Sequence, residues 1–382
     1  MSSDIYHYGI PVLTAVWPEG NVFVLGGGGG SAKTGIMNRV LLVKFEHGNL
    51  SDPLSEVDCN DEYPFRFALH PNSSDLVVGL GAKSAKHLKI ESLEKADKAN
   101  TKLVEVSEGE TIEKLGAISE VISSLKFSQD GKLLCLGYER GWIQVFEWPE
   151  MKERVRCRDN VDFSSLNDID VSPDSQTIAT TSERGLCEFW SIEDGKLLNT
   201  LNKPSLRAPR YAHVRFHPAS SSCRIYTTVN TGKDGGYLFK WSVGKNWKPK
   251  MICKRKVATE AVSSFAVSQR GDLLAIGNNV GDLLVVSGGG MYPLQKVKGA
   301  HMVFVTALVF QNENLDEVPG KTIGLLSASA DHSARITHVQ KKSELRAWLS
   351  AYAWLILLIL LACLLIQLDR YASTTSTTKD EL

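Results

Sequence analysis

Five consecutive glycines, Gly26 to Gly30, open a stretch that runs on through Asn38 and differs in composition from the rest of the chain. Ordering five glycines costs much backbone entropy, so a chain that keeps them needs conformations closed to other residues, or a partner close to the backbone. Strand-like apolar runs flank the stretch on both sides. We therefore look for the function of the chain first at this loop.

Three readings of the loop compete. Gly27 to Thr34 nearly fits the phosphate-binding pattern of a glycine, four residues and Gly-Lys-Ser/Thr, but Ala32 replaces the last glycine. Residues 39–45 then have strand character, whereas a phosphate loop opens a helix. The second reading is a flexible hairpin without a function, and the third is a loop that recognises a partner. No serine elbow, paired carboxylate motif or His-x-x-x-His ligand pair accompanies it, so whether the chain is an enzyme stays open.

A repeated unit must position this loop. From residue 10 onward an apolar strand, a polar turn and a second apolar strand recur, and seven equivalent positions lie 43 to 58 residues apart. This is the period of four-stranded propeller blades with insertions. The fold class expected is all-β, a seven-bladed β-propeller, with the glycine loop between the second and third strands of the first blade. The seven positions are Val16, Leu69, Phe127, Val171, Phe216, Val267 and Phe310.

The units resemble WD repeats in degenerate form, since no Trp-Asp dipeptide ends a copy. Only the last unit approaches the usual pattern, with His301 upstream and Asp331 in a turn. In such blades these two side chains make buried hydrogen bonds, so we interpret both as structural. His70 and His217 each precede a proline at the same turn of their blades, which favours a turn role over catalysis.

A transmembrane helix is predicted for residues 347–367. About 20 residues without a charge, at roughly 1.5 Å per residue, match a hydrocarbon core of roughly 30 Å. The expected division is a propeller over 1–340, a basic linker over 341–346, the span, and a tail over 368–382. The tail ends in the retrieval signal Lys379, Asp380, Glu381, Leu382, which is read in the lumen of the endoplasmic reticulum (ER). Together with Lys341, Lys342 and Arg346 before the span, it predicts a cytosolic propeller, a lumenal C-terminus and contact with the KDEL retrieval receptor.

The charge balance and the cysteine spacing argue against several functional classes. The 43 basic and 43 acidic side chains cancel, so no global positive field attracts nucleic acid. A local basic run remains, which is ordinarily a solvated surface. The seven cysteines are scattered without a Cys-x-x-Cys pair, which indicates no zinc or redox site and a reducing compartment. The basic run consists of Lys248, Lys250, Lys254, Arg255 and Lys256.

The glycine run followed by Ser31 to Gly35, Ile36 and Asn38, in a chain that ends in a membrane anchor, resembles a known family. It is the family of ER-membrane guanine-nucleotide exchange factors for the small GTPase that starts assembly of the COPII vesicle coat. An animal relative is named prolactin regulatory element-binding protein, and the layout here is plant-like. The resemblance implies activation of this GTPase for ER-to-Golgi transport, without covalent catalysis and without a bound nucleotide of the factor's own.

The resemblance also implies roles for individual residues. Asn38 would ligate a potassium ion together with loop carbonyl groups, and Ile36 would be an apolar wedge against the GTPase. From the residues alone, Asn38 is equally a turn residue and Ile36 a core residue of the next strand. Changes in a rim loop are expected to cost little stability, on the order of 0.5 kcal/mol or less. The remaining GTPase-binding positions are Gly26, Gly27, Gly28, Gly29, Gly30, Ser31, Lys33, Thr34, Gly35 and Met37.

A non-catalytic relative is the alternative function. The plant phosphate transporter traffic facilitator resembles the exchange factors in propeller and anchor but is regarded as a helper of cargo exit without exchange activity. The Ile36-x-Asn38 spacing favours exchange. A DNA-binding function is disfavoured by the neutral charge and the anchor.

Overall fold

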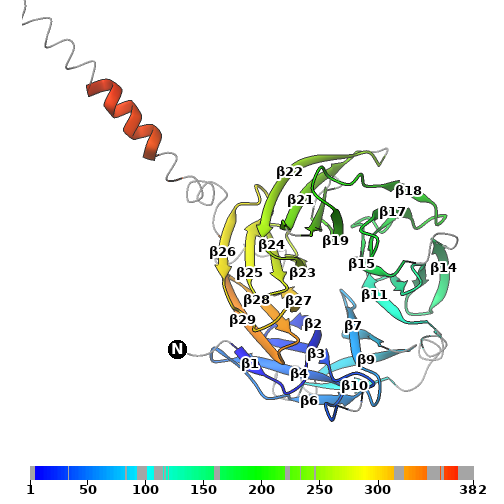
Figure 1. Ribbon diagram of the computed structural model, residues 1–382. Helices are drawn as coiled ribbons and strands as arrows, with labels where there is room; N and C mark the ends of the chain where they lie inside the picture. Colours follow the sequence, from blue (N-terminus) through cyan, green and yellow to red (C-terminus); the bar gives the residue numbers. More distant parts are fainter. Residues whose placement is uncertain are drawn as a thin grey trace, which may run out of the picture.

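The computed structural model contains seven antiparallel sheets arranged in a ring (Figure 1). The strands form where short runs of apolar residues are buried on both faces, as in β3 and β12, whose residues are all buried. The predicted seven-bladed propeller is confirmed. The structure describes residues 5–32, 34–81, 84–92, 101–106, 115, 118, 120–158, 164–219, 224–232, 234–244, 247–313, 322–341, 353 and 357–368.

Each blade has four strands from the centre outward, and the first has an additional short strand that also pairs with β4. The first three blades are β2 (Val12–Glu19), β3 (Val22–Gly27), β4 (Arg39–Glu46), β5 (Asn49–Leu50) and β6 (Ser55–Asp58); β7 (Pro64–Leu69), β8 (Asp75–Leu80), β9 (Ala85–Ser92) and β10 (Thr101–Glu105); and β11 (Ile122–Phe127), β12 (Leu133–Tyr138), β13 (Ile143–Glu147) and β14 (Lys152–Cys157). The fourth and fifth are β15 (Leu166–Val171), β16 (Thr177–Ser182), β17 (Cys187–Ser191) and β18 (Leu197–Thr200); and β19 (Pro209–Phe216), β20 (Arg224–Thr231), β21 (Gly235–Val243) and β22 (Pro249–Ala258). The last two are β23 (Val262–Val267), β24 (Leu273–Asn278), β25 (Leu283–Ser287) and β26 (Pro293–Val297); and β27 (Val305–Phe310), β28 (Thr322–Ser329), β29 (Ser333–Gln340) and β1 (Ile5–His7).

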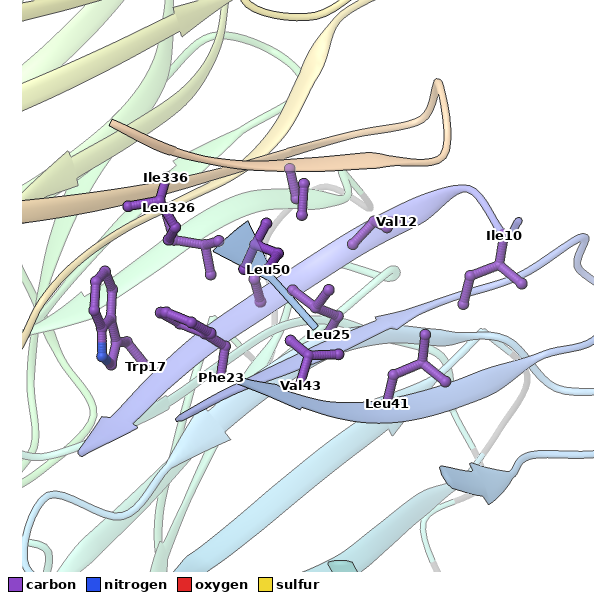
Figure 2. Close-up of a cluster of buried hydrophobic side chains, with 13 residues drawn as sticks. Ile10, Val12, Trp17, Phe23, Leu25, Leu41, Val43, Leu50, Leu326 and Ile336 are labelled. Carbon is purple, nitrogen blue, oxygen red and sulfur yellow. The ribbon is translucent and has the colours of Figure 1, made fainter. Parts of the chain in front are cut away.

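Both ends of the described propeller meet in the seventh blade. Its outermost strand is β1, which pairs antiparallel with β29 in the register Ile5 to Arg335. A buried cluster then joins the seventh blade to the first, with Leu326 and Ile336 on the side of Leu50, Trp17 and Phe23 (Figure 2). The N-terminal strand therefore closes the ring.

The two faces of the ring are distinguished by the direction of the strands and by the chain segments that extend from each face. Thr306 at the start of β27 donates a hydrogen bond to Val12 O at the start of β2 (2.6 Å), and Asn312 beyond β27 donates to Trp17 O (3.0 Å). The central strands β2 and β27 thus run in the same direction, and β3 and β28 run opposite to them. We call the face where β3 and β28 end the loop face, because the glycine loop follows β3.

The chain leaves the propeller on the opposite face. Gln340, the last residue of β29, pairs with Thr322, the first residue of β28. The next residue, Lys341, lies 3.4 Å from the carboxylate of Asp272, in the turn between β23 and β24. The described propeller therefore ends on the face opposite the glycine loop.

Of the predicted span 347–367, the structure describes Ala353 and residues 357–367. Residues 357–367 belong to a helix over 357–368. Each leucine and isoleucine of this helix is more than half exposed. Within the described residues, no helix is both long and apolar enough to cross a membrane. The retrieval signal and residues 342–346 lie outside the described residues.

The structural roles expected for the histidines are confirmed. His301 is buried and its ring nitrogens lie 2.7 and 2.8 Å from the hydroxyls of Ser333 and Ser327. Asp331 accepts hydrogen bonds from the backbone of Met302 (2.6 Å) and Ser333 (3.0 Å), which fixes the turn before β29. In His70 and His217, Nδ1 accepts a backbone hydrogen bond from the second residue after it, at 3.2 Å in both cases.

Burial lowers the pKa of His301 to about 4, against the ordinary 6.5 of an unfolded chain. The folded state therefore holds the neutral ring, and its stability is fully present above the unfolded pKa and falls as pH drops from there toward 4. We expect the Tm to decrease between pH 7 and pH 5 less steeply in His301→Gln than in the wild type. Calorimetric melting across this range measures the difference, with the exposed His338→Gln as control; identical slopes in all three proteins would contradict it.

Candidate functional site

The glycine loop connects two antiparallel strands of the first blade. β3 pairs with β4 through Gly27 and Arg39, so residues 28–38 project beyond the last strand pair on the loop face. The expected position between the second and third strands is confirmed. A strand follows the loop, whereas a phosphate-binding loop needs a helix whose N-terminus holds the anion. The geometry is that of a hairpin.

Asn38 holds the two sides of this hairpin together. Its Oδ1 accepts a hydrogen bond from Gly30 N (2.9 Å), and its Nδ2 donates to Gly30 O (3.1 Å) and Asn60 O (2.9 Å). Its own carbonyl accepts from Cys59 N at 2.9 Å. Asn38 is only 3% exposed. The segment after β6 supports the loop through both the side chain and the backbone of this residue.

Glycine is required where the loop folds against itself. Gly28 has a φ of +152°, and a β-carbon there would lie 2.2 Å from Asn38 Oδ1 and 2.8 Å from Met37 O. At Gly29 a β-carbon would lie 2.3 Å from Thr34 Oγ1 and 3.0 Å from Ile36 O. Oxygen atoms thus pack closely against the loop backbone, two at Gly28 and two at Gly29, and oxygen is the kind of ligand that hard cations prefer.

The two predicted apolar contacts differ in exposure. Ile36 is half-buried and packs against the core cluster of the first and seventh blades. Met37, the next residue, is 46% exposed. Ser31, Thr34 and Gly35 are also exposed, and Lys33 lies outside the described residues. The structure thus gives Ile36 a packing contact and leaves Met37 as an accessible large apolar side chain of the loop.

An apolar patch on the loop face accompanies the loop, and the sequence analysis did not find it. Met302, Val303 and Phe304 precede the central strand β27, and they are 84%, 38% and 44% exposed. Val280 is 49% exposed and belongs to the turn between β24 and β25. This turn packs tightly against the segment before β27, because a β-carbon at Gly281 would lie 2.0 Å from His301 O and 2.9 Å from Val303 O. Strand β27 packs against β2 of the first blade. We call these four residues the apolar patch.

A cavity of about 510 Å³ opens on the same face, between the second and fifth blades. Tyr63 lines it and also approaches the glycine loop, since a β-carbon at Gly30 would lie 3.6 Å from its ring. Arg66 donates to Ser123 O (2.8 Å) and Phe65 O (3.1 Å) in the cavity wall, and burial lowers its pKa to about 10, which leaves it charged. The loop, the apolar patch and the cavity form one continuous side of the ring.

Deeper in the wall, Asp168 is buried beside Arg215, which pairs with it, and 3.5 Å from His213 Nδ1. The charge of Arg215 holds the Asp168 pKa well below its usual range despite burial. Asp168 also accepts a hydrogen bond from Val214 N at 3.1 Å. These bonds join β15 to β19, so we assign the cluster to blade packing. Among the described residues, no group of three His, Cys, Asp or Glu side chains is placed to hold a metal ion.

No protein-family model matches the chain. It is similar to SEC12-like protein 2 of Arabidopsis thaliana, with 28% identity over 316 residues, which are 82% of this chain and 75% of the relative. SEC12-like protein 1 of the same plant is 25% identical over 224 residues, 59% of this chain and 52% of that protein. A periodic tryptophan protein 2 homologue of Dictyostelium discoideum is 26% identical over 61% of this chain and 23% of its own length.

The position of Asn38 corrects the expectation that substitutions in the loop cost little stability. Asn38→Ala would remove three part-buried hydrogen bonds to Gly30 and Asn60, and each hydrogen bond contributes about 0.5–1.5 kcal/mol. We expect a decrease in the free energy of unfolding of at least about 1 kcal/mol, and faster amide exchange at Gly30.

Denaturant unfolding and hydrogen exchange measure the two effects, with the exposed Ser31→Ala as matched control. Unchanged exchange at Gly30 in Asn38→Ala would show that the side chain does not order the loop.

Proposed function

We propose that this chain, which is similar to the plant SEC12-like proteins, acts in COPII-dependent export from the ER as a guanine-nucleotide exchange factor for the small GTPase of the coat. The observation that carries the proposal is the glycine hairpin held by Asn38 on the loop face. An ordered loop beside exposed apolar side chains is the kind of surface that can select one state of a partner protein.

Exchange needs no covalent chemistry. A factor that binds the nucleotide-free GTPase more tightly than the nucleotide-bound form weakens nucleotide binding by the same factor, by linkage. A loop that is already ordered loses little conformational entropy on binding. In this proposal Asn38 orders the loop. Ile36 packs on the blade with the buried part of its side chain and is the apolar wedge with the exposed part, and Met37 also contacts the GTPase.

A potassium ion is part of the proposal. The loop supplies oxygen atoms of the type that a hard monovalent cation prefers, from Asn38 and Met37 near Gly28 and from Thr34 and Ile36 near Gly29. Both hydrogens of the Asn38 amide already donate to carbonyl groups, so Asn38 would ligate through the remaining lone pair of Oδ1. When bound, the ion would supply positive charge that holds these oxygens together.

We further propose that the helix over 357–368 belongs to a single membrane span of the ER, with the propeller in the cytosol and the retrieval signal available to the KDEL receptor in the lumen. A helix that is apolar on all sides and exposed on all sides needs an apolar environment. With such an anchor, the exit of the chain opposite the loop face would leave the glycine loop pointing away from the bilayer.

The cargo-exit helper without exchange activity is the second candidate. It needs the propeller and the anchor but places no demand on an ordered glycine loop. The hydrogen bonds of Asn38 therefore favour the exchange factor.

Met37→Ala should lower kcat/KM for nucleotide release about tenfold, which corresponds to about 1.4 kcal/mol of selective binding to the open GTPase. The melting temperature should change little because Met37 is 46% exposed and lies outside the buried core clusters. A fluorescent-nucleotide release assay measures the rate, with Leu197→Ala, 48% exposed on β18, as matched control. Release by the wild type at the uncatalysed rate would favour the helper function, and equal release by wild type and Met37→Ala would remove Met37 from the site.

Replacing potassium by sodium or lithium should slow nucleotide release, while the melting temperature of the propeller changes little. The physical reason is that a smaller cation fits oxygen ligands spaced for potassium less well. The difference between salts should disappear in Asn38→Ala. Equal rates in the three salts for the wild type would exclude potassium from the mechanism.

A further inference from the structure

The outer edge of the fifth blade combines exposed apolar and basic side chains. In β22, Met251 and Ile252 are 50% and 52% exposed. The register to β21 shifts between Lys240 and Trp241, where Cys253 and Met251 are their partners, so Ile252 is the additional residue of a bulge. The bulge explains why two consecutive side chains both face solvent.

Basic side chains surround this apolar pair without acidic partners. Within the described part of the chain, none of the four cations of β22 has a carboxylate oxygen within 4.0 Å. Lys254 and Lys256 lie 5.8 and 6.0 Å from the ring of Tyr237, and Arg255 lies over Tyr292. The strand therefore presents uncompensated positive charge; the four cations are Lys250, Lys254, Arg255 and Lys256.

The apolar pair lies toward the face from which the chain leaves the ring. Pro249, the first residue of β22, pairs with Val243, the last residue of β21, and Ala258 pairs with Gly236 near its start. β21 is the third strand of its blade, as β29 is in the seventh, so Val243 and Gln340 end on the same face. Met251 and Ile252 are thus close to the rim that faces the exit of the chain (Figure 1 shows β22 at the periphery of the ring).

We propose that the Pro249 end of β22 rests on the anionic surface of the membrane, with Met251 and Ile252 among the headgroups and the basic side chains on lipid phosphates and carboxylates. Apolar side chains flanked by lysine and arginine are the usual means of interfacial attachment. The inference rests on the proposed membrane anchor, which holds this rim near the bilayer. The contact orients the ring, so that the glycine loop points away from the lipid.

A peptide strand adding to β22 is the competing occupant. A bulge and a row of lysines on an edge strand are features that prevent such pairing. Uncompensated charge together with a short apolar pair fits a lipid surface better than an extended peptide backbone.

The full chain reconstituted into vesicles tests the contact by hydrogen exchange of residues 249–258. We expect slower exchange in vesicles in which about a third of the lipid is phosphatidylserine than in pure phosphatidylcholine, since each cation near the surface strengthens attachment several-fold. Raised salt should remove the difference because it screens the attraction. Lys250→Glu combined with Lys254→Glu should remove it as well, whereas Lys152→Glu, on the outer strand of the third blade, should not.

Melting curves of the variants check that the blade still folds. Incorporation into both kinds of vesicle with equal exchange at β22 would overturn the contact while leaving the anchor and the exchange function intact. Failure to incorporate would overturn the anchor and the contact together. Protection of β22 by soluble polyglutamate, but not by anionic lipid, would assign the edge to an acidic protein segment and contradict the proposal.

Discussion

The pairing of β1 with β29 is the constraint on which the ring depends. It places a strand from the start of the chain and three strands from the end of the propeller in one blade, where Ile5 lies opposite Arg335. Thr306 and Asn312 then bond across to the first blade at the two ends of β2. A closed ring gives equivalent strands one direction, so every turn after a second strand lies on the loop face. The glycine loop, the apolar patch and the cavity share that face for this reason, and the exit of the chain lies opposite.

Within this frame, the loop is ordered by a polar contact and not by apolar packing. Glycine supplies backbone conformations and close approach, but it also raises the entropy that ordering must overcome. Three hydrogen bonds from the buried amide of Asn38 oppose that entropy. The proposed exchange function uses the same feature, since a pre-ordered loop can use its contacts to discriminate between states of a partner. The apolar core beneath the loop, with Leu25, Leu41 and Ile10 near its base (Figure 2), gives the hairpin a rigid support.

Much of the fold was predictable because the blade period survives in the sequence. All seven reference positions, from Val16 to Phe310, fall in the central strands of the blades. Strand β1 was not predicted, because three residues carry no periodic signal. The sequence suggested that Asn38 matters but gave no indication of its partner Asn60, which only the fold brings near. The apolar patch was also not predicted, because only the fold brings Val280 close to Met302. The turn that holds Val280 packs against the segment before β27. The roles of Ile36 in binding and of potassium stay predictions.

The central claim is that the propeller selects the nucleotide-free state of the coat GTPase through its loop face. Titration of the full chain in detergent with the GTPase, once freed of nucleotide and once loaded with GDP, measures this selectivity directly. The account predicts binding to the nucleotide-free form that is tighter by at least about a hundredfold, or about 2.7 kcal/mol, with most of this difference lost in Asn38→Ala. Equal affinity for the two forms would contradict it, because a protein that does not distinguish the states cannot shift the equilibrium between them.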